Sequence, residues 1–315
     1  MFAKVMEPQP DSPEGGGPPS VHGHGHVHHH EHPGSHHNHH DPRDAGDPEH
    51  APIAGGVVVI RPASGLSGDM LVAGLARLAG VGTEELATLA VGIGLPEGCV
   101  GLERRAVNQV FGWGCRVNLP PEHHHRTLDD IRRIITAAKT MSPRARQLAE
   151  TSFTLLAEAE GRVHDIPTEA VTFHEVGALD SILDMCLACI LFDRLDPREL
   201  VCGPLPLCDG TVWCSHGKLP APAPAVLDLM AGVPVTGIPS EGETVTPTAI
   251  ALLKGLGARF GPWPSMTVSR TALVFGSRVL PGVANGALFA LGDGPTRTRL
   301  PDPTGEVPQG GRCPG

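Results

Sequence analysis

Apolar residues recur along the chain with two different spacings. Val57-Val-Val-Ile60 is a short β-branched run, as in a buried strand. After a Gly-rich loop, the apolar positions from Met70 to about Ala79 repeat with helical spacing, which predicts an amphipathic helix. Residues 57–79 are therefore expected to form a strand, a loop and a helix in that order.

The later pattern continues to mix the two kinds of element. Helices are expected, by residue number, at about 83–91, 127–138, 143–161, 180–196, 225–231 and 246–261. Strands are expected at about 100–107, 110–119, 200–202, 233–236, 266–274 and 284–291. The Pro- and Gly-rich residues 204–224 are expected to form one long loop, and loops of that length tend to be functional. The predicted fold class is mixed α/β (α+β), as one compact domain over residues 55–293.

Both ends of the chain lack this pattern. Residues 1–54 are dominated by Pro, Gly, His and acids and have little to bury, so they are predicted to be disordered. Residues 294–315 are rich in Pro, Gly and Thr and are predicted to be a second disordered tail. The expected organisation is a His-rich tail, one domain and a short C-terminal tail.

Composition and charge narrow the possible functions. The 315 residues carry a net charge of −10, only 3% are aromatic and Tyr is absent, which argues against a nucleic-acid partner. No secretory signal starts the chain, and no apolar run reaches the ~18 residues of a membrane span. The eight scattered Cys then fit a cytoplasmic protein without disulfides, and Cys186 and Cys189 fit small core residues.

The N-terminal tail contains a dense histidine cluster, with 11 His in the 19 residues from His22 to His40. Imidazole at this density binds Ni(II), Zn(II), Cu(II) or Co(II). An expression tag is the alternative, but Gly, Val, Glu, Pro and Ser interrupt the run. We expect a tail that buffers or delivers metal through, among others, His22, His24, His26, His28, His29, His30 and His32.

One stretch combines an imidazole and three carboxylates directly before an apolar run. His174, Glu175, Asp180 and Asp184 precede the run from Met185 to Phe192. Carboxylates at the edge of a core are costly unless a partner offsets the cost, and a metal ion or substrate would do so. We expect all four to be catalytic, with His174 and Glu175 also binding metal. Capping by Asp180 and a hydrogen-bonded Asp184 are the alternative, which leaves His174 and Glu175 unexplained.

Two helix starts are rich in hydroxyl groups. The loop before Met70 offers backbone N–H groups and a positive helix end to an anion. Its candidate substrate-binding residues are Ser64, Gly65, Ser67, Gly68 and Asp69, although capping alone could explain Asp69. Thr246 is the expected N-cap of a later helix, and Thr246 and Thr248 are further candidates.

More histidines fall in segments expected to be loops. His123, His124 and His125 directly precede a predicted helix, and His216 lies in the Pro/Gly-rich segment near Cys208 and Cys214. Three adjacent histidines are uncommon in a solvated loop, so metal or substrate contact is expected for them. A lone His164 after a helix is more often structural.

Seven motifs stand in the order and spacing of the nickel-insertion (LarC) protein family, which the chain resembles over roughly residues 57–293. They are Ser64-Gly-Leu-Ser-Gly-Asp-Met70, His123-His-His-Arg126, Phe173-His-Glu-Val-Gly-Ala-Leu-Asp-Ser-Ile-Leu-Asp184, Pro204-Leu-Pro-Leu207, Ser215-His-Gly217, Pro220-Ala-Pro-Ala-Pro224 and Glu241-Gly-Glu-Thr-Val-Thr-Pro-Thr248.

The resemblance implies a nickel chelatase, or cyclometallase, of the lyase class. Ni(II) would be inserted between the two thiocarboxylate sulfurs of pyridinium-3,5-bisthiocarboxylic acid mononucleotide, with a nickel–carbon bond, to give the nickel-pincer cofactor of lactate racemase. The family consumes CTP with Mg(II) or Mn(II) in this reaction. The site residues given above, and a homo-oligomer, are the corresponding expectations for this chain.

The chain departs from the family pattern in three places that bear on function. Arg61 stands where the family usually has an acid, and Leu273-Val-Phe-Gly276 lacks the glycine-rich pattern expected there. Family members commonly carry a further C-terminal, CTP-binding portion, which a separate partner chain could supply. A nickel store or metallochaperone without catalysis is therefore the alternative to the enzyme.

Overall fold

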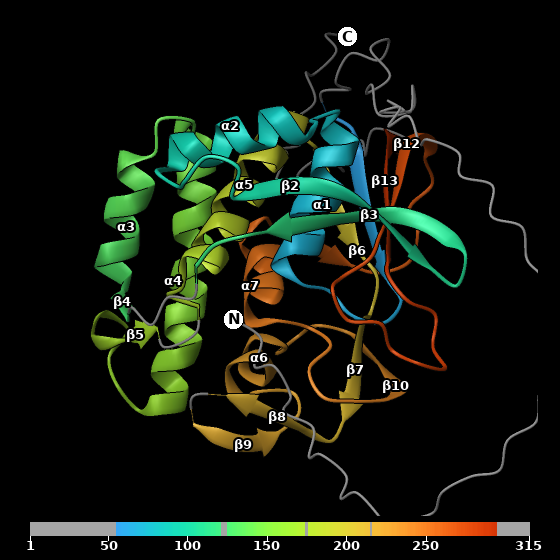
Figure 1. Ribbon diagram of the computed structural model, residues 1–315. Coiled ribbons are helices and arrows are strands. Elements are labelled where there is room, and N and C mark those ends of the chain that lie inside the picture. Colours follow the sequence, from blue (N-terminus) through green and yellow to red (C-terminus); the bar gives the residue numbers. More distant parts are fainter. Residues whose placement is uncertain (1–54, 121–124, 174–175, 215, 295–315) are drawn as a thin grey trace, which may run out of the picture.

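The computed structural model describes residues 55–120, 125–173, 176–214 and 216–294 (Figure 1). The predicted fold class is confirmed, because these residues combine seven α-helices with a large mixed sheet. None of the described helices is long and apolar enough to cross a membrane. The predicted tails, residues 1–54 and 294–315, lie outside the described residues except for Gly294.

The large sheet has seven strands in the order β11-β6-β1-β13-β12-β3-β2. Strand β1 pairs in parallel with β6 and antiparallel with β13, so it is a central strand. Its residues from Val57 to Ile60 are buried, which explains the unbroken β-branched run. The strands are β1 Val57–Pro62, β2 Val100–Val107, β3 Val110–Val117, β6 Glu199–Cys202, β11 Arg259–Phe260, β12 Thr267–Val274 and β13 Ala287–Asp293.

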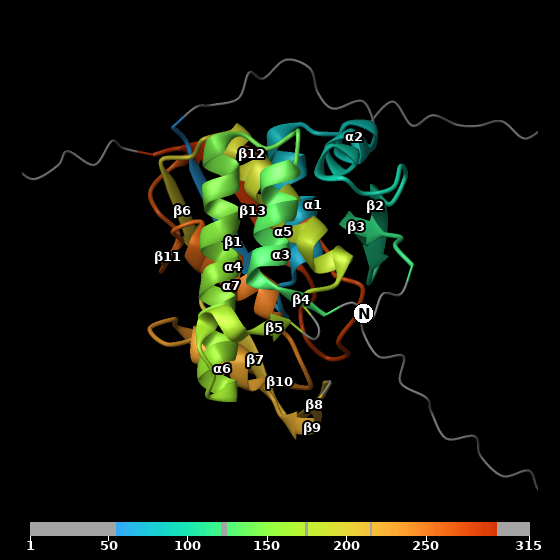
Figure 2. The same cartoon turned by 90° about the vertical axis from the view of Figure 1, so that its left-hand side faces the viewer.

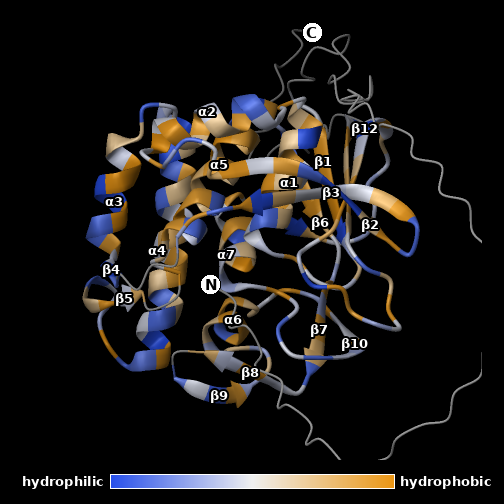
Figure 3. Cartoon of the chain, in the orientation of Figure 1, coloured by the Kyte–Doolittle hydropathy of each residue, from blue (hydrophilic) through white to orange (hydrophobic). Residues whose placement is uncertain are grey.

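The helices lie on one side of this sheet (Figures 1 and 2). Helix α1 packs directly against the sheet strands β3, β12 and β13, and α5 packs on α1. Figure 3 shows hydrophobic colour concentrated in the interior helices and more polar colour on the outer helix α3. The helices are α1 Gly68–Ala79, α2 Thr83–Ile93, α3 Leu128–Ala137, α4 Pro143–His164, α5 Leu179–Leu195, α6 Pro224–Leu229 and α7 Pro247–Gly255, with a 3-10 turn at Thr168–Ala170.

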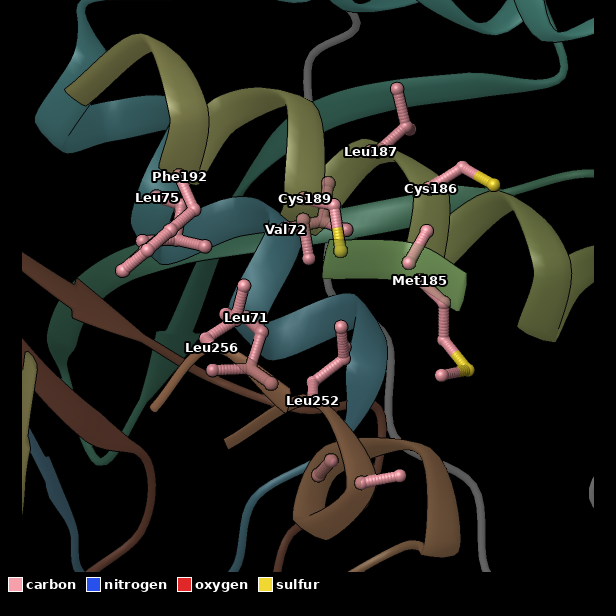
Figure 4. Packing of buried hydrophobic residues seen from close by; sticks show 14 of the residues in the cluster. Leu71, Val72, Leu75, Met185, Cys186, Leu187, Cys189, Phe192, Leu252 and Leu256 are labelled. Atoms are coloured by element: carbon pink, nitrogen blue, oxygen red, sulfur yellow. The ribbon is translucent and has the colours of Figure 1, made fainter. Parts of the chain in front are cut away.

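Helix α5 is the centre of the core. Every residue from Met185 to Phe192 is buried, and Figure 4 shows Cys189 and Phe192 of this run beside Val72 and Leu75 of α1. Cys186 and Cys189 are fully buried, as expected for core residues, and burial raises the pKa of the Cys186 thiol to about 12. The polar start of α5 is therefore attached directly to a continuous run of buried residues.

The expected long loop at residues 204–224 was wrong. Those residues form β7 Leu205–Asp209, β8 Thr211–Cys214 and β9 Gly217–Pro220, followed by the start of α6. Strand β7 pairs with β10 Val235–Glu241, and β8 pairs with β9. These are two-stranded ladders, in which every strand has a free edge, so prolines that would break a central strand are tolerated.

Two predicted boundaries also differ from the structure. Helix α7 ends at Gly255 rather than near 261, because the chain turns at Gly257 with a positive φ of 74° and then forms β11. Helix α4 continues past Gly161 to His164 and ends where Asp165 adopts a left-handed conformation with φ 52°. The second difference matters below, because it places His164 on the helix rather than after it.

Close packing of α1 on the sheet gives a test of the fold. A Cβ added at Gly74 would lie 2.4 Å from the ring of Phe289 on β13, so the helix could not stay at its present distance. We expect Gly74→Ala to lower the free energy of unfolding by about 1–3 kcal/mol, the usual cost of overpacking a core. Urea titration followed by circular dichroism measures this.

Gly237→Ala is the matched control, because Gly237 is exposed on β10 and a Cβ there would meet no atom within 4 Å. Equal effects of the two substitutions would contradict the described contact between α1 and β13.

Candidate functional site

Helix α5 meets the start of helix α1 at Gly68. A Cβ added at Gly68 would lie 2.8 Å from Oδ2 and 2.9 Å from Cβ of Asp184. The absence of a side chain at Gly68 therefore lets the Asp184 carboxylate lie directly against the first turn of α1. This contact joins two stretches that the sequence had singled out separately, the Ser-Gly loop and the acidic segment before α5.

Asp184 is an unsatisfied acid. Its Oδ1 atom is inaccessible to solvent and has no hydrogen-bond partner. Burial raises the pKa of Asp184 well above its ordinary value, and the negative charges of Asp69 and then Asp180 raise it further. The Oδ1 atom of Asp184 therefore lacks the hydrogen bond that the alternative considered from sequence would give it.

Asp69, in the first turn of α1, is the second acid of the site. Ser67 Oγ donates a hydrogen bond to its Oδ1. Burial raises the pKa of Asp69, and this shift is partly opposed by the Ser67 hydrogen bond and by the charge of Arg105. Asp69 and Asp184 thus form a pair of interacting carboxyl groups with raised pKa values, which we call the acid pair.

Asp180 lies one turn before Asp184 on α5. The N-cap residue of α5 is Ala178, so Asp180 does not occupy the capping position. Its Oδ1 accepts the N–H of Ser181 at 2.8 Å. Because its charge acts on Asp184, Asp180 adds a third carboxylate to the same region.

Strands β2 and β3 supply the other neighbours of the acid pair. Arg105 donates from Nη2 to the carbonyl of Cys115 at 3.2 Å and from Nε to Oε1 of Glu103 at 2.7 Å. The Cys115 thiol is buried, and burial together with the charges of Asp184 and Asp69 raises its pKa well above the ordinary value. Cys115 therefore stays a neutral thiol and is a poor metal ligand in this state.

The two helix starts predicted to bind substrate lie side by side. The backbone N–H of Leu66 donates to the carbonyl of Thr244 at 2.9 Å, and the N–H of Thr246 donates to the carbonyl of Leu66 at 3.1 Å. A Cβ at Gly65 would lie 2.3 Å from the Thr244 carbonyl oxygen, so only glycine permits this approach. The loops before α1 and α7 are therefore locked together.

The predicted substrate-binding hydroxyls have protein partners. Ser64 is buried, and its Oγ accepts the N–H of Gly286 at 3.2 Å. Thr246 Oγ1 accepts the N–H of Ala249 at 3.2 Å, which caps α7, and lies 2.8 Å from Thr248 Oγ1. These contacts hold the loops in shape, and their role in substrate binding stays a prediction.

Charge at the start of α1 favours a cation rather than a bare anion. A helix N-terminus attracts negative charge, and Asp69 and Asp184 already supply it. A free phosphate brought to the same place would be repelled by ionised carboxylates. A divalent cation would relieve their mutual repulsion and could then bind an anionic group of a ligand.

The predicted histidine ligands fall partly outside the described residues. His123, His124, His174, Glu175 and the tail histidines cannot be placed. His125 is exposed and precedes strand β4 (Arg126–Thr127), which pairs with β5 (Thr172–Phe173). Arg126 pairs with Phe173 in this ladder, so the described residues next to the two histidine motifs in sequence lie beside each other.

His216 and His164 come together from distant parts of the chain. His216 is exposed on the β8–β9 hairpin, and its ring centre lies 4.7 Å from that of His164. Sequence reasoning missed His164, because nothing in the spacing relates the end of α4 to a hairpin far along the chain. Arg105 and Cys115 were missed for the same reason, although their strands were predicted.

The described residues contain no group of three His, Cys, Asp or Glu side chains already arranged to hold a metal ion. Arg61, which stands in place of an acid, is directed elsewhere: its Nη1 donates to the carbonyl of Gly261 at 2.8 Å and its guanidinium lies 5.3 Å from the ring centre of Trp263. Arg61 is therefore not among the charges that act on Asp69 or Asp184.

The fold and site define a mixed α/β domain. Its acid pair lies where the first turn of α1 packs against Asp184 of α5. A family model described as nickel insertion protein matches residues 58–300, and the chain belongs to this family. No solved structure matches the chain significantly.

Curated relatives agree with the family match. A putative nickel insertion protein of Citrifermentans bemidjiense is 40% identical over 236 residues, which cover 73% of this chain and 60% of the relative. That of Thermomicrobium roseum is 42% identical over 228 residues, 71% of this chain and 55% of the relative. The chain is also 31% identical over 215 residues to the pyridinium-3,5-bisthiocarboxylic acid mononucleotide nickel insertion protein of Staphylococcus epidermidis, covering 68% of this chain and 54% of the relative.

The unfavourable burial of Asp184 predicts a pH-dependent gain of stability on its removal. Its raised pKa means that the unfolded chain releases this proton at a lower pH than the folded protein does, so stability is lost as the pH rises above 3.8 towards the folded pKa. We expect Asp184→Asn to raise the free energy of unfolding at pH 7 by about 0.5–2 kcal/mol, as single stabilising substitutions commonly do.

The gain should shrink as the pH is lowered towards 3.8, where both states carry the protonated acid. Thermal unfolding across pH measures it, with Asp209→Asn at an exposed aspartate as the control. A variant less stable than its parent at every pH would show that a favourable contact holds Asp184.

Proposed function

We propose that this chain inserts Ni(II) into pyridinium-3,5-bisthiocarboxylic acid mononucleotide, forming the nickel-pincer cofactor of lactate racemase. Membership of the nickel insertion protein family and the printed name of the Staphylococcus epidermidis relative support this proposal. The acid pair is the observation that carries it, because insertion needs both a cation site and a proton acceptor. In this proposal nickel is a substrate, and the reaction is a cyclometallation of the lyase class in the cytoplasm.

A carboxylate with a raised pKa suits the proton transfer in this reaction. Forming the nickel–carbon bond replaces one ring C–H bond, so the ring carbon keeps the bonding electrons for nickel and a proton leaves. General bases work best when their pKa lies near the working pH, and burial moves the pKa of Asp184 in that direction. In this proposal Asp184 accepts the proton, while Asp69 and Asp180 stabilise the incoming cation.

The same carboxylates would suit a second cation. CTP is used with Mg(II) or Mn(II) in the proposed reaction, and both ions prefer carboxylate oxygens. The locked loops before α1 and α7 present Ser67, Gly68, Thr246 and Thr248 beside the acid pair, where a phosphate bridged by such an ion could bind.

Histidines supply the softer ligands that nickel prefers. We assign His123, His124, His125, His174, Glu175 and His216 to nickel binding, and the histidines between His22 and His32 to collecting the metal. The β4–β5 ladder supports the first assignment, because the segments carrying His125 and His174 are joined by it. His174 and Glu175 are also proposed to act in catalysis.

The chain spans about 54–60% of the length of these relatives. We also propose, as the family resemblance implies, that a CTP-binding portion takes part and that the chain works as a homo-oligomer. A nickel store or metallochaperone without catalysis is the competing function.

A nickel-insertion assay with substituted acids tests the proposal. Full-length chain is mixed with the C-terminal portion of a relative, Ni(II), CTP, Mg(II) and the bisthiocarboxylate, and the nickel product is followed by mass spectrometry. Asp184→Asn should lower the rate by about 10²–10⁴-fold, the usual contribution of a general base. If Asp184→Asn is both more stable than the parent protein and slower in nickel insertion, Asp184 serves the reaction and not the stability of the fold.

Asp209→Asn should leave the rate unchanged, because Asp209 is exposed on β7 and separate from the acid pair. Nickel bound without any product in the parent protein, with the second portion present, would reject the enzyme and favour storage. Product formed by Asp184→Asn at the parent rate would reject Asp184 as the base.

A further inference from the structure

Helix α1 and the β2–β3 hairpin share a cluster of arginine and aromatic side chains. The guanidinium carbon of Arg77, in the last turn of α1, lies 4.0 Å from the ring centre of Trp113 on β3. That of Arg104, which pairs with Trp113 across the hairpin, lies 4.9 Å from the same ring centre and 5.7 Å from that of Phe111. We call Arg77, Arg104, Phe111 and Trp113 the arginine–aromatic surface.

Arg104 gives this surface a positive charge that no acid of the described residues balances. Its side chain is exposed, and within the described part of the chain it contacts the two aromatic rings but no carboxylate. The guanidinium groups of Arg104 and Arg77 lie on one indole within about 10 Å of each other, the Debye length at 0.1 M salt, so they repel each other. An anionic partner would relieve this repulsion.

Apolar side chains border the charge. Phe111 is 63% exposed and Val110 is 53% exposed. Both lie at the turn of the hairpin, which extends away from α1 (Figure 1). Arginine and aromatic residues are enriched at protein interfaces, and clusters of arginine recognise acidic motifs. The surface therefore suits an acidic segment that also carries apolar residues.

The chain itself contains a segment of this kind. Residues 41–49 have the sequence Asp-Pro-Arg-Asp-Ala-Gly-Asp-Pro-Glu, with four acids, one arginine and two prolines. The segment precedes Gly55, where the described domain begins, so it is tethered to the sheet. Its charge is opposite to that of the arginine–aromatic surface.

The tether is long enough for the two to meet. Strand β3 is the third strand from β1 in the sheet, about 14 Å away at the usual spacing. Trp113 is level with Val274 and, through β13, with Pro62, so it lies about 23 Å from Gly55 along the strand direction. The chain from Asp44 to Gly55 spans up to about 36 Å when extended, which covers the distance.

We propose that residues 41–49 dock on the arginine–aromatic surface. Their carboxylates pair with Arg104 and Arg77, and their prolines cover Phe111. Because exposed ion pairs are individually weak and screened by salt, docking is reversible and sensitive to ionic strength. Docking keeps the histidines from His22 to His40 near the domain. That consequence rests on the proposed collection of nickel by the tail, whereas the docking itself does not.

Indole NMR signals of the full-length chain test the docking. The chain has three tryptophans, so Trp113 can be assigned with Trp113→Phe, and Trp213 and Trp263 serve as internal controls. Replacing the four acids of residues 41–49 by Asn or Gln should shift the Trp113 signal at low salt and leave the other two in place. In the parent chain, about 0.5 M NaCl should move the Trp113 signal to its position in this variant, because salt screens the ion pairs.

A synthetic peptide of residues 38–52 measures the same contact in trans. Added to the acid-substituted chain, it should bind, and Arg104→Gln should weaken its binding about two- to fivefold, as the loss of one exposed ion pair does. Arg104→Lys keeps the charge and should retain most of the affinity. Arg133→Gln is the matched control, because Arg133 lies on α3 with 76% of its side chain exposed, and it should leave the affinity unchanged.

A Trp113 signal that responds neither to the acid substitutions nor to salt would overturn the docking. A shift that appears only at high protein concentration would also overturn it, because the segment would then come from another copy of the chain. Equal weakening by Arg104→Gln and Arg133→Gln would reduce the contact to general charge attraction and reject the surface. The samples contain no nickel, CTP or bisthiocarboxylate, so the result is independent of the proposed insertion reaction.

Discussion

Asp184 packs against the bare backbone of Gly68, and the candidate site depends on this contact. The acid lies in the second turn of α5, directly before the buried run Met185–Phe192, and one of its oxygens has no hydrogen-bond partner. An isolated polar atom in such a place opposes folding. The surrounding packing of α1, α5 and the sheet keeps it there, since the residues from Met185 to Phe192 cannot leave the core without a much larger loss.

Acids whose pKa values are strongly raised by burial and by neighbouring charges are typical of functional sites. Burial raises the pKa of both acids and the charge of Asp69 raises that of Asp184 further, while Ser67, Arg105 and backbone N–H groups oppose only part of the shift at Asp69. A divalent cation would remove the remaining repulsion. The loops before α1 and α7, locked by the Leu66 and Thr246 backbone hydrogen bonds, keep the acid pair in place before any ligand arrives.

Sequence reasoning succeeded where a local rule decides the structure. The β-branched run at Val57, the capping residues Thr127 and Thr246 and the apolar run after Asp184 each gave the correct element. It failed at residues 204–224, where proline suggested a loop but unpaired strand edges accommodate it. The importance of Asp184 was predicted, yet its neighbours Arg105 and Cys115 and the pairing of His164 with His216 depend on tertiary packing that no spacing reveals.

The protonation of Asp184 is the most direct test of the acid pair. Carbon-13 NMR of selectively labelled aspartate carboxyl groups, assigned with Asp184→Asn, reports this titration in the folded protein. The structure predicts that Asp184 keeps its proton to a pH well above the ordinary aspartate value of 3.8, and that added Mg(II) or Ni(II) lowers its pKa. An Asp184 carboxyl that titrates near 3.8 and does not respond to either ion would contradict the account.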